Sequence, residues 1–338
     1  MTASAKALPP FKPLPMLPPK IYSQRRGDGS YIIRSLYDLG PQHRSIAHLF
    51  EERAHQHPAR NLLAQRTPEG PWRFITYGEA NQQASAIAQA LHDRNLGPGT
   101  PLVILSSNSI EHAVMMLGAM KARVPVAPVS VAYALFSQDH GKLRHVAALT
   151  KPRMIFVDNG PLYAKAIKAL DLAGVEVVTL IPSPDLTSTS YDSLLETNAG
   201  PAVRASMHKI DHATVAKYLF TSGSTGMPKP VPTTQGAMCS MIGGQEGLRD
   251  NSRDPEFDPD RVDSFLDWLP WNHISGSNVN FNGALWNGSI FWIDGGKPTP
   301  ALFHETIRNI RQASPSVTEQ RRSPSPCSPR RWSRTRRC

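Results

Sequence analysis

Short apolar runs alternate with amphipathic segments along most of the chain. Residues 103–105, 124–129, 154–157 and 175–178 are apolar runs of strand length. Between the runs, apolar residues recur at helical spacing, first in a segment that Gly97 is expected to end and then over 110–117. Strands that alternate with helices predict an α/β fold with a mostly parallel sheet and right-handed crossovers.

The second half of the chain continues this alternation after a polar connection over residues 181–207. A strand is expected from Val215, followed by a helix that begins at Thr233 or Thr234 as its cap. Further strands are predicted at 265–269 and 289–293, and a helix at 300–312 with Thr299 as its cap and Pro300 in its first turn.

The two ends of the chain differ from this pattern. Residues 1–20 are proline-rich and favour an extended surface arm, whereas Ser45 is expected to cap a helix that Pro58 stops. Residues 314–338 have no apolar period and too little apolar surface to order themselves. We therefore predict an arm over 1–43, one α/β subdomain over 44–200, a second over 201–312, and a disordered Arg/Ser/Pro tail over 313–338.

Composition and charge narrow the class of protein. The chain of 338 residues is 40% hydrophobic, enough for a sizeable core, and its three cysteines favour a reducing compartment. With no secretory signal and no apolar run of 18 residues, we expect a cytoplasmic protein without a membrane span. The formal charge of +10 is concentrated at the end, because residues 314–338 hold seven arginines and one glutamate. We therefore do not expect nucleic acid as the main partner.

The most informative chemistry lies in Y-L-F-T-S-G-S-T-G-M-P-K, where an apolar strand enters a hydroxyl-rich and glycine-rich loop. An isolated cluster of this kind is usually a solvated loop. The preceding strand and the Pro-Lys exit instead predict a phosphate-binding loop, with hydroxyl donors, backbone N–H groups and a cation. Its candidate residues are Thr221, Ser222, Gly223, Ser224, Thr225, Gly226 and Lys229.

This string resembles the phosphate loop of the adenylate-forming superfamily, which includes acyl-CoA synthetases, luciferases and adenylation domains of peptide synthetases. The resemblance extends over about residues 44–312, through I-T-Y-G-E at 75–79, G-A-M-K-A at 118–122 with V-P-V-A-P at 124–128, and W-L-P-W-N-H at 268–273. It implies the large N-terminal domain of such an enzyme, with mostly parallel sheets flanked by helices. It also implies an acid–thiol ligase that uses ATP, Mg²⁺ and coenzyme A.

A narrower resemblance points to the feruloyl-CoA synthase branch. It rests on Asn272, His273, Asn280, Phe281, Asn282 and the run D-G-G-K-P-T-P at 294–300. The resemblance implies that His273, Asn272 and Trp271 contact the acid, which is expected to be a hydroxycinnamate such as ferulate. The alternative is that the histidine and the tryptophans are packed core residues and that the asparagines bond loop backbone.

Two departures from the family pattern follow the loop lysine, namely Pro230 in place of a glycine and Gln235 in place of a histidine. The family segments "YGxTE" and "TGD", and the small C-terminal domain with its catalytic lysine, do not follow residue 313. We therefore expect a truncated or frame-shifted chain with little activity, no catalytic residue of its own and no metal ligands. The alternative is a non-catalytic nucleotide- or nucleic-acid-binding protein that uses the basic tail.

Overall fold

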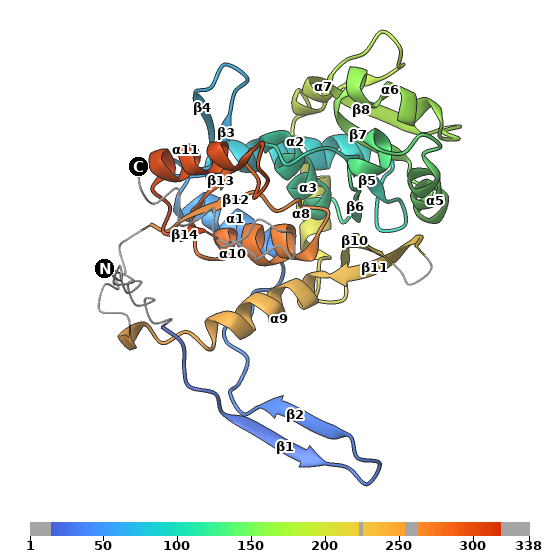
Figure 1. Cartoon of the computed structure of the whole chain (residues 1–338). Coiled ribbons are helices and arrows are strands. Elements are labelled where there is room, and N and C mark those ends of the chain that lie inside the picture. The colour runs from blue at the N-terminus through green and yellow to red at the C-terminus, as the bar shows by residue number, and fades with distance from the viewer. Residues whose placement is uncertain (1–14, 223–225, 254–257, 259–261, 319–338) are drawn as a thin grey trace, which may run out of the picture. The chain divides into compact units, whose positions relative to one another are not determined.

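The structure is a computed structural model that describes residues 15–222, 226–253, 258 and 262–318. Contacts divide the chain into a small unit, Met1–Gln42 with Ser240–Arg261, and a large unit, His43–Cys239 with Val262–Cys338. The large unit contains two sheets and most of the helices (Figure 1).

The first sheet of the large unit has seven strands in the order β11-β10-β6-β5-β7-β8-β9. Every neighbouring pair is parallel except β10 and β11, which are antiparallel. Its strands are β5 (Leu102–Leu105), β6 (Val126–Pro128), β7 (Met154–Asn159), β8 (Glu176–Ile181), β9 (Thr189–Ser190), β10 (Val215–Ser222) and β11 (Pro228–Thr234).

The second sheet has five strands in the order β14-β12-β13-β3-β4, and only β3 and β4 are antiparallel. Its strands are β3 (Asn61–Arg66), β4 (Trp72–Thr76), β12 (Ser264–Asp267), β13 (Ile290–Ile293) and β14 (Val317–Thr318). Strands from both sides of residue 200 therefore share each sheet, so the sheets do not follow the predicted boundary there.

Helices cover both sheets, and α3 lies between them. Helix α3 (Ile110–Lys121) contacts β3 of one sheet and β6 of the other, as Figure 1 shows. All twelve of its residues are buried, which is the pattern of a helix packed on every side. The remaining helices are α1 (Ile46–Gln56), α2 (Tyr77–Asp93), α4 (Ala132–Leu135), α5 (Gly141–Thr150), α6 (Gly160–Lys168), α7 (Tyr191–Leu195), α8 (Pro201–His208), α9 (Gln235–Glu246), α10 (Asn282–Trp286) and α11 (Phe303–Ala313), with a π-helical segment η2 (Ser275–Phe281).

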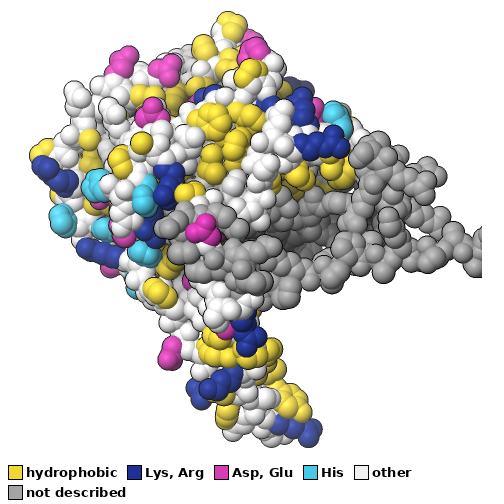
Figure 2. Space-filling view, turned by 90° about the vertical axis from the view of Figure 1, so that its left-hand side faces the viewer, with side chains coloured by type: hydrophobic (Ala, Val, Ile, Leu, Met, Phe, Trp, Pro, Cys, Tyr) yellow, Lys and Arg dark blue, Asp and Glu magenta, His cyan; other side chains and the backbone are white. Residues whose placement is uncertain are grey.

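The small unit contains an antiparallel hairpin, β1 (Ile21–Arg25) with β2 (Tyr31–Ser35), and a short 3₁₀ turn η1 (Asn251–Arg253). Hydrophobic and basic side chains gather on the hairpin in Figure 2, among them Ile21, Tyr31 and Ile33, each more than half exposed. The predicted arm thus contains regular structure, while residues 1–14 lie outside the described part of the chain.

Local sequence signals set several element ends. Ser45 accepts a hydrogen bond from the His48 backbone N–H and begins α1, as predicted. Thr76 and Glu79 form a reciprocal capping box that begins α2. The predicted helix end at Gly97 is wrong, because α2 ends at Asp93 and Asn95 takes the left-handed turn with φ 57°.

Three other expectations need correction. The stretch 181–207 is not a plain polar connection, since Ser190 caps α7 and Pro201 begins α8. The last predicted helix begins at Phe303 rather than at Pro300, and Leu302 takes the cap position instead of Thr299. The apolar pattern does not end at residue 313, because Val317 and Thr318 pair with β12; residues 319–338 lie outside the described chain.

Candidate functional site

The predicted phosphate loop joins two antiparallel strands. Strand β10 leads into it, and β11 returns so that Thr221 pairs with Lys229 and Ser222 with Pro228. Gly226 has φ 78°, and a side chain there would meet only open space, so the left-handed turn is what favours glycine. Residues 223–225 and the Ser222 side chain lie outside the described part of the structure.

The strand pairing brings a hydroxyl group and a cation together. Residues directly opposite each other in an antiparallel pair point to the same face, so Thr221 and Lys229 project side by side. Both are exposed. This gives an anion a hydroxyl donor and an ammonium group at one point.

Neighbouring elements hold both ends of strand β11 in place. His145 of α5 donates through Nε2 to the carbonyl oxygen of Pro228 over 3.0 Å. The Thr234 hydroxyl accepts from the Ala237 N–H and caps α9, which confirms one of the two predicted caps. Gln235 is fully buried, and its side-chain oxygen accepts from the Ile46 N–H over 3.0 Å. The second departure from the family pattern therefore has a structural role, joining the start of α9 to α1.

The predicted acid-contacting residues differ in exposure. Trp271 is fully buried, Asn272 is half-buried and His273 is exposed. The Ser275 backbone N–H donates to His273 Nδ1 over 3.3 Å, so the neutral ring carries its proton on Nε2 and can donate from there. The role of these three residues in binding the acid remains a prediction. His273 is the one of the three that offers a carboxylate an exposed donor.

Asn108, which follows β5, holds this segment in place. Its side chain donates to the Leu269 carbonyl oxygen and accepts from the Trp271 N–H, over 2.8 and 3.0 Å. Asn108 was not predicted from the sequence, although binding residues commonly follow the carboxyl end of a parallel strand.

Lys217 joins the two parts of the candidate site and was also missed. It lies on β10, is fully buried, and donates through Nζ to the Asn278 side-chain oxygen over 3.0 Å. Asn278 belongs to η2, five residues after His273. The strand that enters the phosphate loop is therefore bonded directly to the segment that carries His273.

Burial lowers the pKa of two basic groups here. It lowers the pKa of Lys217 to about 7. It also lowers the pKa of His112 on α3 to about 4, with the Lys217 charge acting in the same direction and the Ser107 carbonyl opposing it. His112 is therefore neutral at pH 7, and its ring lies perpendicular to Trp271 with centroids 5.2 Å apart.

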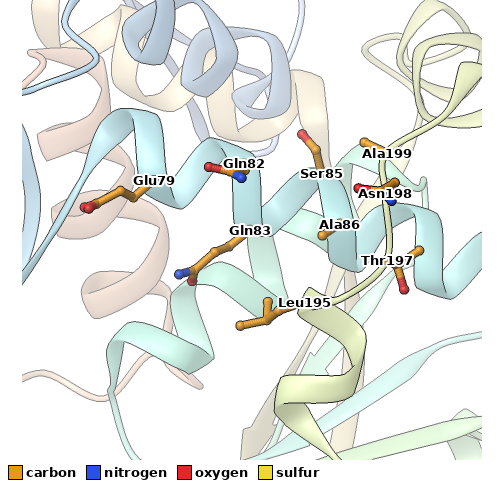
Figure 3. A pocket seen from close by; sticks show the side chains of 9 residues that line it. All are labelled: Glu79, Gln82, Gln83, Ser85, Ala86, Leu195, Thr197, Asn198 and Ala199. Carbon is orange, nitrogen blue, oxygen red and sulfur yellow. The ribbon is translucent and has the colours of Figure 1, made fainter.

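A pocket of about 360 Å³ lies elsewhere in the large unit, between α2 and the segment after α7 (Figure 3). It is lined by Glu79, Gln82 and Gln83 of α2, by Leu195 at the end of α7, and by Thr197 and Asn198 after that helix. None of the predicted site residues lines this pocket, and Glu79 is already bonded in the capping box. We therefore do not assign it to the candidate site.

The described residues contain no group of three or more His, Cys, Asp or Glu placed to hold a metal ion. In the same part of the chain, no helix combines the length and the apolarity that a bilayer crossing needs. Cys239 is buried and unpaired, and burial raises the pKa of its thiol to about 11.

Comparison with known proteins identifies the family. Residues 50–318 match the sequence model of the AMP-binding enzymes. The chain belongs to the AMP-binding enzyme family. This confirms the adenylate-forming resemblance, together with the α/β fold of the N-terminal domain of such enzymes.

Relatives and solved structures agree with this family. The AMP-binding chain is 28% identical over 199 residues to the PKS-NRPS hybrid synthetase acdB of Aspergillus candidus, covering 57% of this chain and 7% of the relative. It is 24% identical over 195 residues to bacitracin synthase 2 of Bacillus licheniformis, covering 58% and 6%. The chain thus spans a small part of these curated relatives.

One similar solved structure is the N-terminal subdomain of NpsA from Klebsiella oxytoca in complex with 3-hydroxyanthranilyl-AMSN. It aligns with a TM-score of 0.57 at 21% identity, and the alignment covers 84% of this chain and 62% of that one. A fatty acyl-adenylate ligase from L. pneumophila, in complex with acyl adenylate and pyrophosphate, aligns with a TM-score of 0.59 at 17% identity, covering 81% and 44%. At these identities the alignments establish the fold alone.

Proposed function

We propose that this AMP-binding enzyme is an acid–thiol ligase that activates a carboxylic acid with ATP. In the first step a carboxylate oxygen attacks the α-phosphorus, the bond from that phosphorus to the bridging oxygen breaks, and pyrophosphate leaves. In the second step the thiol sulfur of coenzyme A attacks the acyl carbon of the adenylate, AMP leaves, and the thiol proton passes to solvent.

The observation that carries this proposal is the pairing of Thr221 with Lys229 at the mouth of the β10–β11 turn. The first step builds negative charge on phosphate oxygens, and fixed donors together with a cation stabilise such charge. The family match supports this assignment, and the L. pneumophila relative has an acyl adenylate and pyrophosphate bound. Because the chain covers only part of its relatives, the complete reaction is part of the proposal.

Mg²⁺ would enter with ATP. The exposed Thr221 hydroxyl can supply an oxygen near the phosphates, and Mg²⁺ bound to a nucleotide is held mainly by phosphate oxygens and water with few protein ligands. The donors in the described chain are compatible with that arrangement. The ion would neutralise charge on the phosphate oxygens.

We further propose that the acid is a hydroxycinnamate such as ferulate. His273 can donate its Nε2 proton to the carboxylate, beside Asn272. Two other residues of the feruloyl-type resemblance hold the fold: Asn280 donates to the Asp267 carboxylate over 2.9 Å, and Phe281 packs on Trp271 with ring centroids 5.0 Å apart. The proposed contact with the acid therefore rests on His273 and Asn272 rather than on Asn280.

Replacing the loop lysine tests nucleotide binding. Lys229→Ala is expected to weaken ATP·Mg²⁺ binding by calorimetry about 10- to 100-fold, the effect of losing a hydrogen bond to a charged group. Lys165→Ala, at an exposed position of α6, is the matched control and should leave the affinity unchanged. An unchanged affinity in Lys229→Ala would contradict the proposed phosphate site.

Ferulate-dependent exchange of labelled pyrophosphate into ATP tests the first chemical step. Any exchange is expected to be slow, to depend on ferulate and to be lost in Lys229→Ala. Exchange with other acids but not with ferulate would reject the hydroxycinnamate and leave the adenylation chemistry in place.

A further inference from the structure

Lys217 is a charged side chain in the interior of the large unit. Its strand has β6 on one side and β11 on the other, and its side chain is fully buried. The partner of Nζ in the described chain is the neutral amide of Asn278, so two of the three N–H groups of an ammonium have no acceptor there. A buried cation without a carboxylate partner lowers stability unless another role retains it.

Two neighbouring aromatic residues also have unused polar atoms. His112 Nδ1 lies 3.2 Å from the Ser107 carbonyl oxygen, so it carries the proton and leaves Nε2 as a bare acceptor. Nε2 of His112 and the indole N–H of Trp271 are both buried and have no hydrogen-bond partner among the described residues. A buried polar group that is left without a partner lowers the stability of the fold.

Together these groups match one functional group of a ligand. Lys217 offers a donor and His112 Nε2 offers an acceptor. Both adjoin the same segment, because Lys217 is bonded to Asn278 of η2 and His112 packs on Trp271, four residues before η2. A hydroxyl group both accepts and donates, so it satisfies both atoms at once. A carboxylate or an ether oxygen only accepts and would leave His112 Nε2 unsatisfied.

The position of Lys217 relates this cluster to the phosphate loop. Tyr218 and Phe220 pack against a buried hydrophobic cluster. Because side chains alternate along a strand, Lys217, Leu219 and Thr221 share the opposite face of β10. Lys217 precedes Thr221 by four residues, which is about 13 Å along a strand. If the carboxylate of the acid lies near the loop, only an extended acid is long enough for its opposite end to contact Lys217.

We propose that Lys217 and His112, with Asn278 orienting the lysine, bind a hydroxyl group at the end of the acid opposite its carboxylate. These residues then select a hydroxylated aromatic acid over the same acid without the hydroxyl. The inference rests on the proposed function for the direction in which the acid lies.

Three acids of one shape test this assignment on the purified full chain by calorimetry in the presence of ATP·Mg²⁺. The acids are 4-hydroxycinnamate, cinnamate, which lacks the oxygen, and 4-methoxycinnamate, whose oxygen accepts but cannot donate. We expect 4-hydroxycinnamate to bind about 10- to 100-fold more tightly than cinnamate, since a buried site built for a hydroxyl rejects the analogue without it. The methoxy acid should lose most of this advantage because of His112.

Two variants test whether the preference for 4-hydroxycinnamate depends on Lys217 and His112. Lys217→Met keeps the length of the side chain and removes the charge, and it should bring the affinities for 4-hydroxycinnamate and cinnamate within about threefold of each other. His112→Phe should remove the preference for 4-hydroxycinnamate over its methoxy analogue while it retains the ring against Trp271. Circular dichroism verifies that each variant is folded, and the comparison within the wild type does not depend on either variant.

The outcomes for the two proposals are distinguishable. Equal wild-type affinity for 4-hydroxycinnamate and cinnamate, or no binding of either, overturns the role of Lys217. An unchanged preference in a folded Lys217→Met also overturns it. If these acids bind as expected but ATP·Mg²⁺ binding does not depend on Lys229, the proposed phosphate site fails while the hydroxyl site stands. Dependence on Lys229 without a hydroxyl preference gives the reverse.

Discussion

At the scale of single residues, chemistry depends on what surrounds each side chain. Lys229 and Lys217 lie on neighbouring strands, yet one is exposed and the other is fully buried. Lys229 therefore offers a hydrated charge to an anion from solution. Lys217 has an interior ammonium whose pKa is lowered by burial to about 7, so its charge changes near neutral pH.

The lowered pKa of Lys217 predicts a pH-dependent stability. Above pH 7 the folded chain loses this proton, whereas the unfolded chain keeps it up to about pH 10.4. The unfolded state then binds more protons, so the contribution of Lys217 to the unfolding free energy rises with pH across this window and falls towards pH 7. His112, with a pKa of about 4, stays neutral throughout.

Replacing Lys217 by methionine should remove this dependence. We expect Lys217→Met to be more stable than the wild type at pH 7, with a difference that shrinks as the pH rises to 9.5. Urea unfolding at several pH values measures it, and Lys165→Ala serves as the exposed control. A difference that is constant with pH would show that Lys217 is not titrating in the folded protein.

At the scale of elements, the β10–β11 pair fixes the positions of the two ends of the predicted phosphate loop. Strand β11 is the outer strand of its sheet and carries prolines at 228, 230 and 232. Because these prolines are two residues apart, the N–H groups that they lack would all lie on the same edge of the strand. Proline is tolerated in an outer strand when that edge faces away from the sheet. Pro230, the departure from the family pattern, thus belongs to a strand edge that cannot donate to a further strand.

Restoring those donors should promote self-association. The double variant Pro230→Thr with Pro232→Thr is expected to associate at several-fold lower protein concentration than the wild type, because an open strand edge templates pairing. Sedimentation velocity measures this, and Val231→Thr is the control that leaves the prolines in place. If the double variant stays at the wild-type size at all concentrations, the prolines do not protect this edge.

At the scale of the whole large unit, an aromatic cluster connects the two sheets. Trp271 packs against His112 of α3, Phe281 at the end of η2 and Phe291 of β13, with ring centroids 5.0–5.9 Å apart. Because α3 also contacts the seven-stranded sheet, the indole ring links residues from both halves of the fold.

Removing the indole ring should destabilise the unit as a whole. Trp271→Ala is expected to lower the unfolding free energy by about 3–5 kcal/mol, the cost of emptying a large buried site. Urea unfolding followed by circular dichroism measures it. Phe74→Ala, at a position 46% exposed, is the control and should cost far less. An equal loss in both variants would contradict the central role of Trp271.

The sequence alone determined the family, the order of the central strands β5 to β8, and the strand β10 that enters the predicted phosphate loop. These follow from local signals: the apolar runs of β5 to β8, the Ser45 and Thr234 caps, and the strand that enters the glycine-rich turn. The roles of Thr221, Lys229 and His273 remain predictions at this level.

How these segments meet depends on contacts between residues that are far apart in the sequence. Local patterns do not tell which strands pair, so the antiparallel return of β11 and the sharing of each sheet by both halves of the chain were not foreseen. Lys217 is a charged residue that a local pattern would place at the surface. It becomes an interior group because β6, β11 and η2 enclose it, and those three elements are far apart in sequence.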